Sequence, residues 1–263
     1  MKSILTVACL ALFLIFFNCS ENGTESEDSK NYVLIDEQFN NNTKVELFAE
    51  AAPFVGYNRL YVSLYDSASG TKIINSQVLF SPLMDMGTMV HSCPFENPQS
   101  TEAQDNKFAG SAIFIMSGMW GMGVEFHSSD DAHIGNVEFT FDVAPTSLVK
   151  KLDASDGITY FLTLMQPEKW RVGLNDLELC INFRQSMMSF PAKEEMTLTM
   201  SPWMDMGEGV GHGSPNNVNP QHTNNGHYNG VINYTMSGAW DINFEINNGD
   251  STIAQATFEV MVE

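Results

Sequence analysis

The sequence predicts an all-β protein made of two tandem immunoglobulin-like β-sandwich domains. Short runs of alternating apolar and polar residues predict the strands, and turn-forming residues separate these runs. An internal repeat divides the chain into two similar halves. Six or seven short strands in about 110 residues are typical of an immunoglobulin-like sandwich. No long helix is predicted outside the N-terminal segment.

The predicted strands follow the period of two that a half-buried strand requires. Leu60, Val62 and Leu64 alternate with their neighbours, and residues 177–182 repeat this pattern in the second half. Further runs of this kind lie at residues 45–48, 73–80, 112–116, 122–126 and 137–143.

Four blocks in the same order define the repeat. Residues 110–120 (GSAIFIMSGMW) align with residues 230–240 (GVINYTMSGAW) at an offset of 120 positions. A Met-Asp-Met-Gly phrase has the same offset, and two flanking blocks have offsets of 117 and 119. The alternation is interrupted at Pro145, which predicts a boundary there. We therefore expect one sandwich over residues 32–145, the first repeat, and another over residues 146–263, the second repeat.

The N-terminal segment predicts an export signal. Lys2 precedes an apolar run over residues 4–17, and Cys19 follows closely. Such a run is short for a transmembrane helix. It resembles a bacterial lipoprotein signal, in which residues 1–18 are removed, Cys19 is lipidated, and residues 19–31 form an acidic flexible tether. Simple secretion is the alternative, because Asn18 stands where a small residue is usual.

The formal net charge of −20 limits the partners that the protein can have. A strongly acidic surface argues against nucleic acid and anionic lipid, and it attracts cations. No stretch beyond the signal is long and apolar enough to cross a bilayer. We expect a body outside the cytoplasm, held to the cell envelope, and to its outer membrane, by the lipid on Cys19.

The Met-Asp-Met-Gly phrase is the strongest candidate for a functional site. It places Met84 and Met86 in the first repeat and Met204 and Met206 in the second, and a histidine follows each pair, as His91 and His212. In an extended segment residues i and i+2 project to the same side, so each pair of thioethers is expected to point one way. Two thioethers and an imidazole suit copper, especially Cu(I). The alternative is that these methionines fill gaps under a loop.

Additional ligands are available near both phrases. Cys93 can add a soft thiol to the first site, and His222 and His227 lie in the loop after the second phrase, which is also typical of solvated loops. Alternatively, Cys93 and Cys180 form a disulfide in an oxidising compartment. Cys180 is expected to face away from the core of its own repeat.

Three further features have a structural interpretation beside a functional one. His127 and His133 flank two aspartates, which favours a polar hairpin tip over a zinc or Cu(II) site. Met116 and Met236 are expected in the cores. Trp120 and Trp240 are also expected in the cores, although an indole beside a copper site is chemically reasonable.

The chain resembles the YtkA-like domain family, which is related to the FixH-like proteins. Three features carry the resemblance in both repeats: a Gly-x-Asn-x-Leu block (Gly56 and Gly173 begin it), the Met-x-Met loop with its histidine, and a closing block that ends in Gly-x-Trp. The resemblance implies an envelope-exposed sandwich domain with links to copper or oxidase assembly. The second repeat is closer to the family pattern, since Gly211 and Gly213 flank its histidine.

These observations predict a non-enzymatic envelope lipoprotein that binds copper for handling or delivery. We find no nucleophile elbow, phosphate loop, dinucleotide fingerprint or His-Glu-x-x-His helix in the sequence. Two alternatives involve no metal. The protein could be a structural or adhesive module, or an accessory subunit that binds a membrane complex or another envelope protein.

Overall fold

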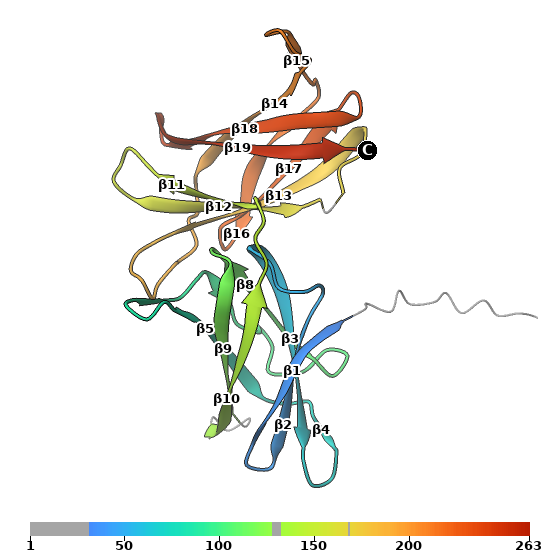
Figure 1. The fold of residues 1–263 in the computed structure, drawn as a ribbon, viewed down its shortest axis with the longest axis vertical. Coiled ribbons are helices and arrows are strands. Elements are labelled where there is room, and N and C mark those ends of the chain that lie inside the picture. Colours follow the sequence, from blue (N-terminus) through green and yellow to red (C-terminus); the bar gives the residue numbers. More distant parts are fainter. Residues whose placement is uncertain (1–31, 128–132, 168) are drawn as a thin grey trace, which may run out of the picture. The chain divides into compact units, whose positions relative to one another are not determined.

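The computed structural model describes residues 32–127, 133–167 and 169–263. The described residues form β-strands and no helix, and the strands form four antiparallel sheets (Figure 1). The all-β prediction is therefore confirmed. Residues 31–263 belong to one compact unit, so the division into domains of 32–145 and 146–263 stays a prediction. The predicted signal, Cys19 and the tether lie outside the described residues.

The first repeat contributes ten of the described strands. They are β1 (Val33–Asn40), β2 (Thr43–Ala49), β3 (Gly56–Asp66), β4 (Lys72–Ile73), β5 (Gln77–Asp85), β6 (Val90–His91), β7 (Phe95–Glu96), β8 (Phe108–Phe114), β9 (Gly118–His127) and β10 (His133–Val143). One sheet has the order β1-β2-β3-β8-β7 with β4 beside β3, and the other has the order β10-β9-β5-β6.

The second repeat contributes nine strands with a closely similar order. They are β11 (Val149–Asp153), β12 (Thr159–Gln166), β13 (Gly173–Phe183), β14 (Thr197–Asp205), β15 (Gly211–Gly213), β16 (Val218–Asn224), β17 (His227–Tyr234), β18 (Gly238–Asn248) and β19 (Ser251–Val262). Its sheets have the orders β11-β12-β13-β17-β16 and β15-β14-β18-β19. The internal repeat in the sequence is thus also a repeat in strand order.

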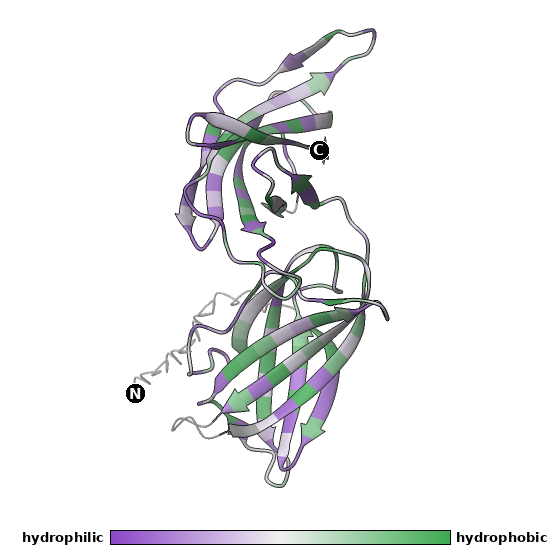
Figure 2. Cartoon of the chain, turned by 90° about the vertical axis from the view of Figure 1, so that its left-hand side faces the viewer, coloured by the Kyte–Doolittle hydropathy of each residue, from purple (hydrophilic) through white to green (hydrophobic). Residues whose placement is uncertain are grey.

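Each repeat buries its own hydrophobic core between its two sheets. Alternation along the strands produces these cores, as the alternating colours along the strands in Figure 2 show. In β14, for example, Leu198, Met200, Pro202 and Met204 are buried, while the residues that alternate with them are exposed. Trp120 and Trp240 are at most 1% exposed, which confirms their predicted place in the cores.

The Gly-x-Asn-x-Leu block has a structural role at the start of β3 and β13. The side-chain amide of Asn58 donates to the carbonyls of Phe54 and Gly56, and its Oδ1 accepts from the Phe54 amide. Asn175 makes the same three contacts in the second repeat. These buried asparagines satisfy the backbone of the turn before the strand, where an unpaired group is costly.

One predicted strand is divided in the structure. Residues 73–80 form the end of β4 and the start of β5, with a break between Ile73 and Gln77. Ser76 lies in this break, where its fully buried hydroxyl donates to the carbonyl of His127. Side-chain bonds of this kind compete with strand pairing, and a sequence pattern does not reveal them.

Candidate metal centre

The aspartate and glycine of each Met-Asp-Met-Gly phrase form the tip of a hairpin. The Asp85 carboxylate accepts a hydrogen bond from the Gly87 amide at 2.7 Å, and Asp205 does the same for Gly207 at 2.8 Å. Gly87 and Gly207 have φ angles of 79° and 91°, a region that favours glycine. These residues therefore specify a turn immediately after β5 and β14.

The turn separates the two methionines of each phrase, so the expectation that they point the same way is wrong. Met84 and Met204 lie within the strands and are 6% and 8% exposed. Met86 and Met206 follow the last strand residue, and they are 51% and 62% exposed at the hairpin tips. The alternation of side chains holds only while the chain stays extended, and here it ends at the aspartate.

The structure does bring the buried methionine of each phrase to its histidine. Met204 is paired directly with His212 across β14 and β15, and Met84 is paired with His91 across β5 and β6. Directly opposed residues of an antiparallel pair share a face of the sheet, with Cβ atoms about 5 Å apart. The predicted association of Met204 with His212, and of Met84 with His91, is therefore present in the fold.

In the second repeat, a methionine from the repeated block at residues 230–240 lies beside His212. The Sδ atom of Met236 lies 3.3 Å from Nε2 of His212. Met236 and its counterpart Met116 are each 42% exposed, so their predicted place in the cores is wrong. Both residues follow the last residue of β17 or β8, in the bend before the next strand. The Cε atom of Met204 reaches the same bend, within 2.9 Å of where a Cβ on Gly238 would lie.

Hydrogen bonding fixes the tautomer of both histidines. Nδ1 of His212 lies 3.0 Å from the carbonyl oxygen of Gly213, and Nδ1 of His91 lies 2.8 Å from that of Ser92. A carbonyl only accepts hydrogen bonds, so each Nδ1 carries the hydrogen. In the neutral ring Nε2 then bears a lone pair. A backbone carbonyl on one nitrogen is how metal-binding histidines are commonly oriented.

The neutral His212 ring cannot make a hydrogen bond with Met236. Its Nε2 lone pair faces a thioether sulfur, which is also only an acceptor. Two acceptors at this distance need a cation or a proton between them. The pair therefore fits a shared metal ion.

The first repeat has a buried histidine nitrogen with no partner at the equivalent position. His91 is 3% exposed, and its Nε2 has no hydrogen-bond partner among the described residues. A buried polar atom without a partner is costly and uncommon in folded proteins. Binding of a metal ion would satisfy it.

A tryptophan ring packs against the histidine of each candidate site. The rings of His91 and Trp120 meet edge to face with centroids 5.3 Å apart, and His212 and Trp240 have the same separation. The indole N–H of Trp240 donates to the Met236 carbonyl at 3.1 Å, and Trp120 donates to the Met116 carbonyl at 2.9 Å. These bonds hold the methionine bend against the core. The tryptophans, placed in the cores by the sequence, also contact the candidate sites.

The other predicted ligands lie elsewhere or in unsuitable surroundings. Cys93 belongs to the hydrophobic core of the first repeat, where burial raises the pKa of its thiol and disfavours the thiolate that metals bind. His222 contacts the Tyr228 ring, with centroids 5.3 Å apart. Cys93 and Cys180 are free thiols, so the structure contains no disulfide between them. The described residues contain no cluster of three or more His, Cys, Asp or Glu side chains suited to a metal.

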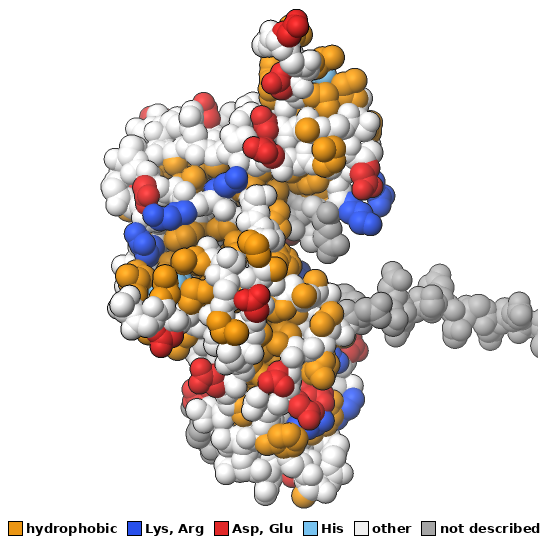
Figure 3. All heavy atoms as spheres, in the orientation of Figure 1, with side chains coloured by type: hydrophobic (Ala, Val, Ile, Leu, Met, Phe, Trp, Pro, Cys, Tyr) orange, Lys and Arg blue, Asp and Glu red, His pale blue; other side chains and the backbone are white. Residues whose placement is uncertain are grey.

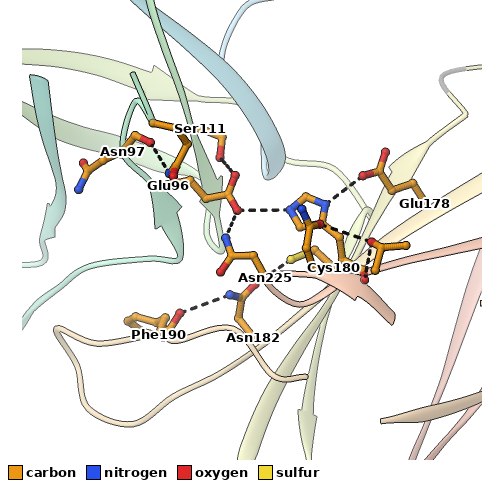
Figure 4. Close-up of polar contacts among 12 residues, drawn as sticks. Glu96, Asn97, Ser111, Glu178, Cys180, Asn182, Phe190 and Asn225 are labelled. Carbon is orange, nitrogen blue, oxygen red and sulfur yellow. Dashed lines mark hydrogen bonds and ion pairs between the residues drawn. The ribbon is translucent and has the colours of Figure 1, made fainter. Parts of the chain in front are cut away.

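His227 belongs to a charged cluster with Glu178 of its own repeat and Glu96 of the first repeat, both labelled in Figure 4. Its Nδ1 lies 2.9 Å from Glu178 Oε1, and its Nε2 lies 3.4 Å from Glu96 Oε1 in the first repeat. Asn225 and Ser111 also donate to Glu96. The hydrogen bonds to Glu178 and then Glu96 raise the pKa of His227 to about 9, so the ring is charged at neutral pH. The prediction that His227 adds to the Met204 site is therefore wrong.

Cys180 lies beside this cluster. It faces away from the core of its own repeat, as predicted, but it is only 3% exposed. Its thiol donates to Asn182 Oδ1 at 3.3 Å, and it lines a cavity of about 260 Å³ together with Tyr57, Glu96 and His227. The sequence of one repeat cannot show that the other repeat covers this face.

The His127 and His133 hairpin is only partly described. His127 contacts the carboxylate of Glu125 at 2.8 Å, and β9 and β10 pair up to this point. The two aspartates and the side chain of His133 lie outside the described part. The choice between a polar tip and a metal site therefore stays a prediction.

Comparisons with known proteins give no family name. No family model and no curated protein sequence matches the chain. Solved structures with similar folds include domains 5–6 of the surface-layer protein SbsC, at 14% identity and a TM-score of 0.32 over 88% of this chain and 98% of that one. An Escherichia coli adhesin, FdeC, has 13% identity and a TM-score of 0.27 over 88% and 66% of the two chains.

The D0–D1 domains of intimin are also similar, at 10% identity and a TM-score of 0.24 over 80% of this chain and 93% of that one. SbsC is described as a surface-layer protein and FdeC as an adhesin. At such TM-scores the similarity carries no information on the function of this chain.

Proposed function

We propose that this chain is a non-catalytic protein of the bacterial cell envelope that binds Cu(I) in each repeat and serves in copper handling or delivery. One observation carries the proposal. The Nε2 atom of His212 and the Sδ atom of Met236 face each other at 3.3 Å, and both are acceptors that a metal ion would bridge.

The proposed ligands in the second repeat are His212, Met236 and Met204. The two thioethers and the neutral imidazole form a soft, uncharged donor set, which favours Cu(I) over calcium, magnesium or manganese. Trp240 and the Gly213 carbonyl hold the ring of His212 in place. Met206 is replaced as a ligand by Met236, because it lies at the exposed hairpin tip.

The equivalent ligands in the first repeat are His91, Met84 and Met116. The unpaired Nε2 of His91 supports this assignment, since it is a buried lone pair beside a buried thioether. Met116 occupies the same place relative to Trp120 as Met236 does relative to Trp240. The two sites would therefore bind two ions per chain.

The envelope location rests on the N-terminal signal and on Cys19. No helix in the described part of the chain is long and apolar enough to span a bilayer. The net charge of −20 would concentrate cations near the body of the protein. Membership of the YtkA-like family, with its links to copper, is part of this proposal.

Thermal unfolding with and without metal tests the proposal. A ligand at about 100 times its dissociation constant should stabilise the folded protein by about 2.7 kcal/mol. We expect Cu(I), or Ag(I) as a redox-stable substitute, to raise the unfolding midpoint. The rise should become smaller in a chain that carries His212→Ala and Met236→Leu. The absence of any rise in the unaltered chain would contradict the proposal.

A structural or adhesive module without metal is the second candidate. The observation that favours it is the apolar tip of the β14–β15 hairpin, where Trp203, Met206 and Val210 are 42%, 62% and 63% exposed. Figure 3 shows hydrophobic side chains gathered on this hairpin. Exposed apolar patches commonly mark protein contacts. This candidate predicts that no soft metal stabilises the protein and that a Met236→Leu chain works normally.

A further inference from the structure

The histidines of the two candidate sites differ in burial, whereas Met116 and Met236 are each 42% exposed. His91 and the following Ser92 are each 3% exposed. Their counterparts in the second repeat are more open, since His212 is half-buried and Gly213 is exposed. The strand pairing, the tryptophan contact and the tautomer are the same in both sites.

A loop of the second repeat contacts the first repeat beside His91. This loop, residues 184–190, follows β13, and we call it the Met187 loop (Figure 1). The amide of Ser92 donates to the carbonyl of Met187 at 2.9 Å. The contact is made by the residue next to His91, so the loop meets the first repeat beside the histidine.

The Met187 loop is held by several hydrogen bonds. The amides of Gln185 and Ser186 both donate to the carbonyl of Ser189, which closes a tight turn. At its base Arg184 donates to the carbonyl of Thr159, and the buried Phe190 ring lies 5.6 Å from that of Phe161. These contacts fix the loop to the second repeat.

We propose that the Met187 loop makes the first site a closed, retaining site and leaves the second site open for exchange. This inference rests on the proposed function. An ion at His91 would leave only after the loop moves away from Ser92, whereas an ion at His212 would be reached directly from solvent. The protein would hold one ion and pass the other to a partner.

Release of Ag(I) from single-site chains tests this inference. In the full chain, His212→Ala leaves the first site and His91→Ala leaves the second. Each chain is loaded with Ag(I) and then mixed with excess thiosulfate, and release is followed by tryptophan fluorescence, since a tryptophan contacts each histidine. We expect the His212→Ala chain to release Ag(I) about tenfold more slowly, as for an opening step that costs about 1.4 kcal/mol.

A shortened loop provides the matched comparison. Replacing residues 186–189 by Asn-Gly, a compact turn, should remove the contact with Ser92 and raise release from the first site about tenfold, without changing release from the second. The control is the same replacement at residues 67–70, a loop whose hydrogen bonds stay within the first repeat and do not involve Ser92.

The outcomes separate the two proposals. Uptake of Ag(I) by both single-site chains with equal release rates would overturn the closed and open assignment and leave metal binding intact. This comparison needs no loop variant, so it holds even if the shortened chain does not fold. If neither chain takes up Ag(I), the proposed metal-binding function itself is wrong.

Discussion

Met204 and His212 occupy directly opposed positions on β14 and β15, and Met84 and His91 occupy the same positions on β5 and β6. The pairing follows from the turn that Asp205 and Gly207 impose, because the turn sets which residues meet across the hairpin. The Met-Asp-Met-Gly phrase thus specifies a hairpin that places a thioether against an imidazole.

The first prediction distinguishes Met236 from Met206 as a ligand. Met236→Leu keeps the volume of the side chain but removes the sulfur that faces His212. We expect the affinity of the His91→Ala chain for Ag(I) to fall by about tenfold or more, equivalent to about 1.4 kcal/mol. The matched control, Met206→Leu, changes an exposed tip residue and should leave the affinity unchanged. Competition with a chromophoric chelator measures both, and equal losses would restore Met206 as a ligand.

The second prediction concerns the core role of the first methionine in each phrase. Met84 is 6% exposed within the first core, so Met84→Ala should lower the free energy of unfolding by about 2–5 kcal/mol. Met86→Ala, at a site that is 51% exposed, should change it by less than about 0.5 kcal/mol. Urea unfolding without metal measures both values. Similar values for the two variants would contradict the observed burial.

The third prediction concerns the asparagine of the Gly-x-Asn-x-Leu block. Asn175 makes three hydrogen bonds to the backbone of the turn before β13. Asn175→Ala leaves these groups without partners, so we expect a loss of about 1–3 kcal/mol in unfolding free energy. Asn229→Ala, at an exposed position of β17, serves as the control. A loss no larger than that of the control would show that the turn does not need the side chain.

The fourth prediction is a dependence of stability on pH through His227. Its pKa is about 9 in the folded protein, raised mainly by the hydrogen bonds to Glu178 and Glu96. A raised pKa means that the folded state binds the proton more tightly than the unfolded state, whose value is about 6.5. The stabilisation is therefore complete below about pH 6.5 and is lost as the pH rises towards 9.

The size of this effect is about 2 kcal/mol after allowance for the partly exposed carboxylates. Chemical unfolding between pH 6 and 10 measures it against His227→Gln, which keeps hydrogen-bonding groups but does not titrate in this range. The difference in stability between the two chains should shrink as the pH rises. A difference that stays constant would show that the proton on His227 does not stabilise the fold.

The sequence predicted the class of fold and part of the candidate site. Local alternation was enough for most of the predicted strands, and the recurrence of Trp120 and Trp240 in register was enough to predict their burial. It failed for Met86 and Met236, because each lies just beyond a strand end, where the period of two no longer applies.

Contacts between the repeats could not be predicted at all. The partner of His227 in the first repeat, Glu96, is 131 positions away, and Ser92 meets Met187 through backbone atoms. Neither contact has a local sequence signal. The raised pKa of His227 and the burial of His91 depend on the folded structure and have no local signal in the sequence.

X-ray absorption at the copper edge of the Cu(I)-loaded chain tests the central claim most directly. The account predicts copper retained after desalting and bound by one nitrogen and two sulfur atoms. In the His91→Ala chain, Met236→Leu should then remove one sulfur from the shell. A shell of nitrogen and oxygen alone, or no retained copper, would contradict the account and leave the structural or adhesive module as the better interpretation.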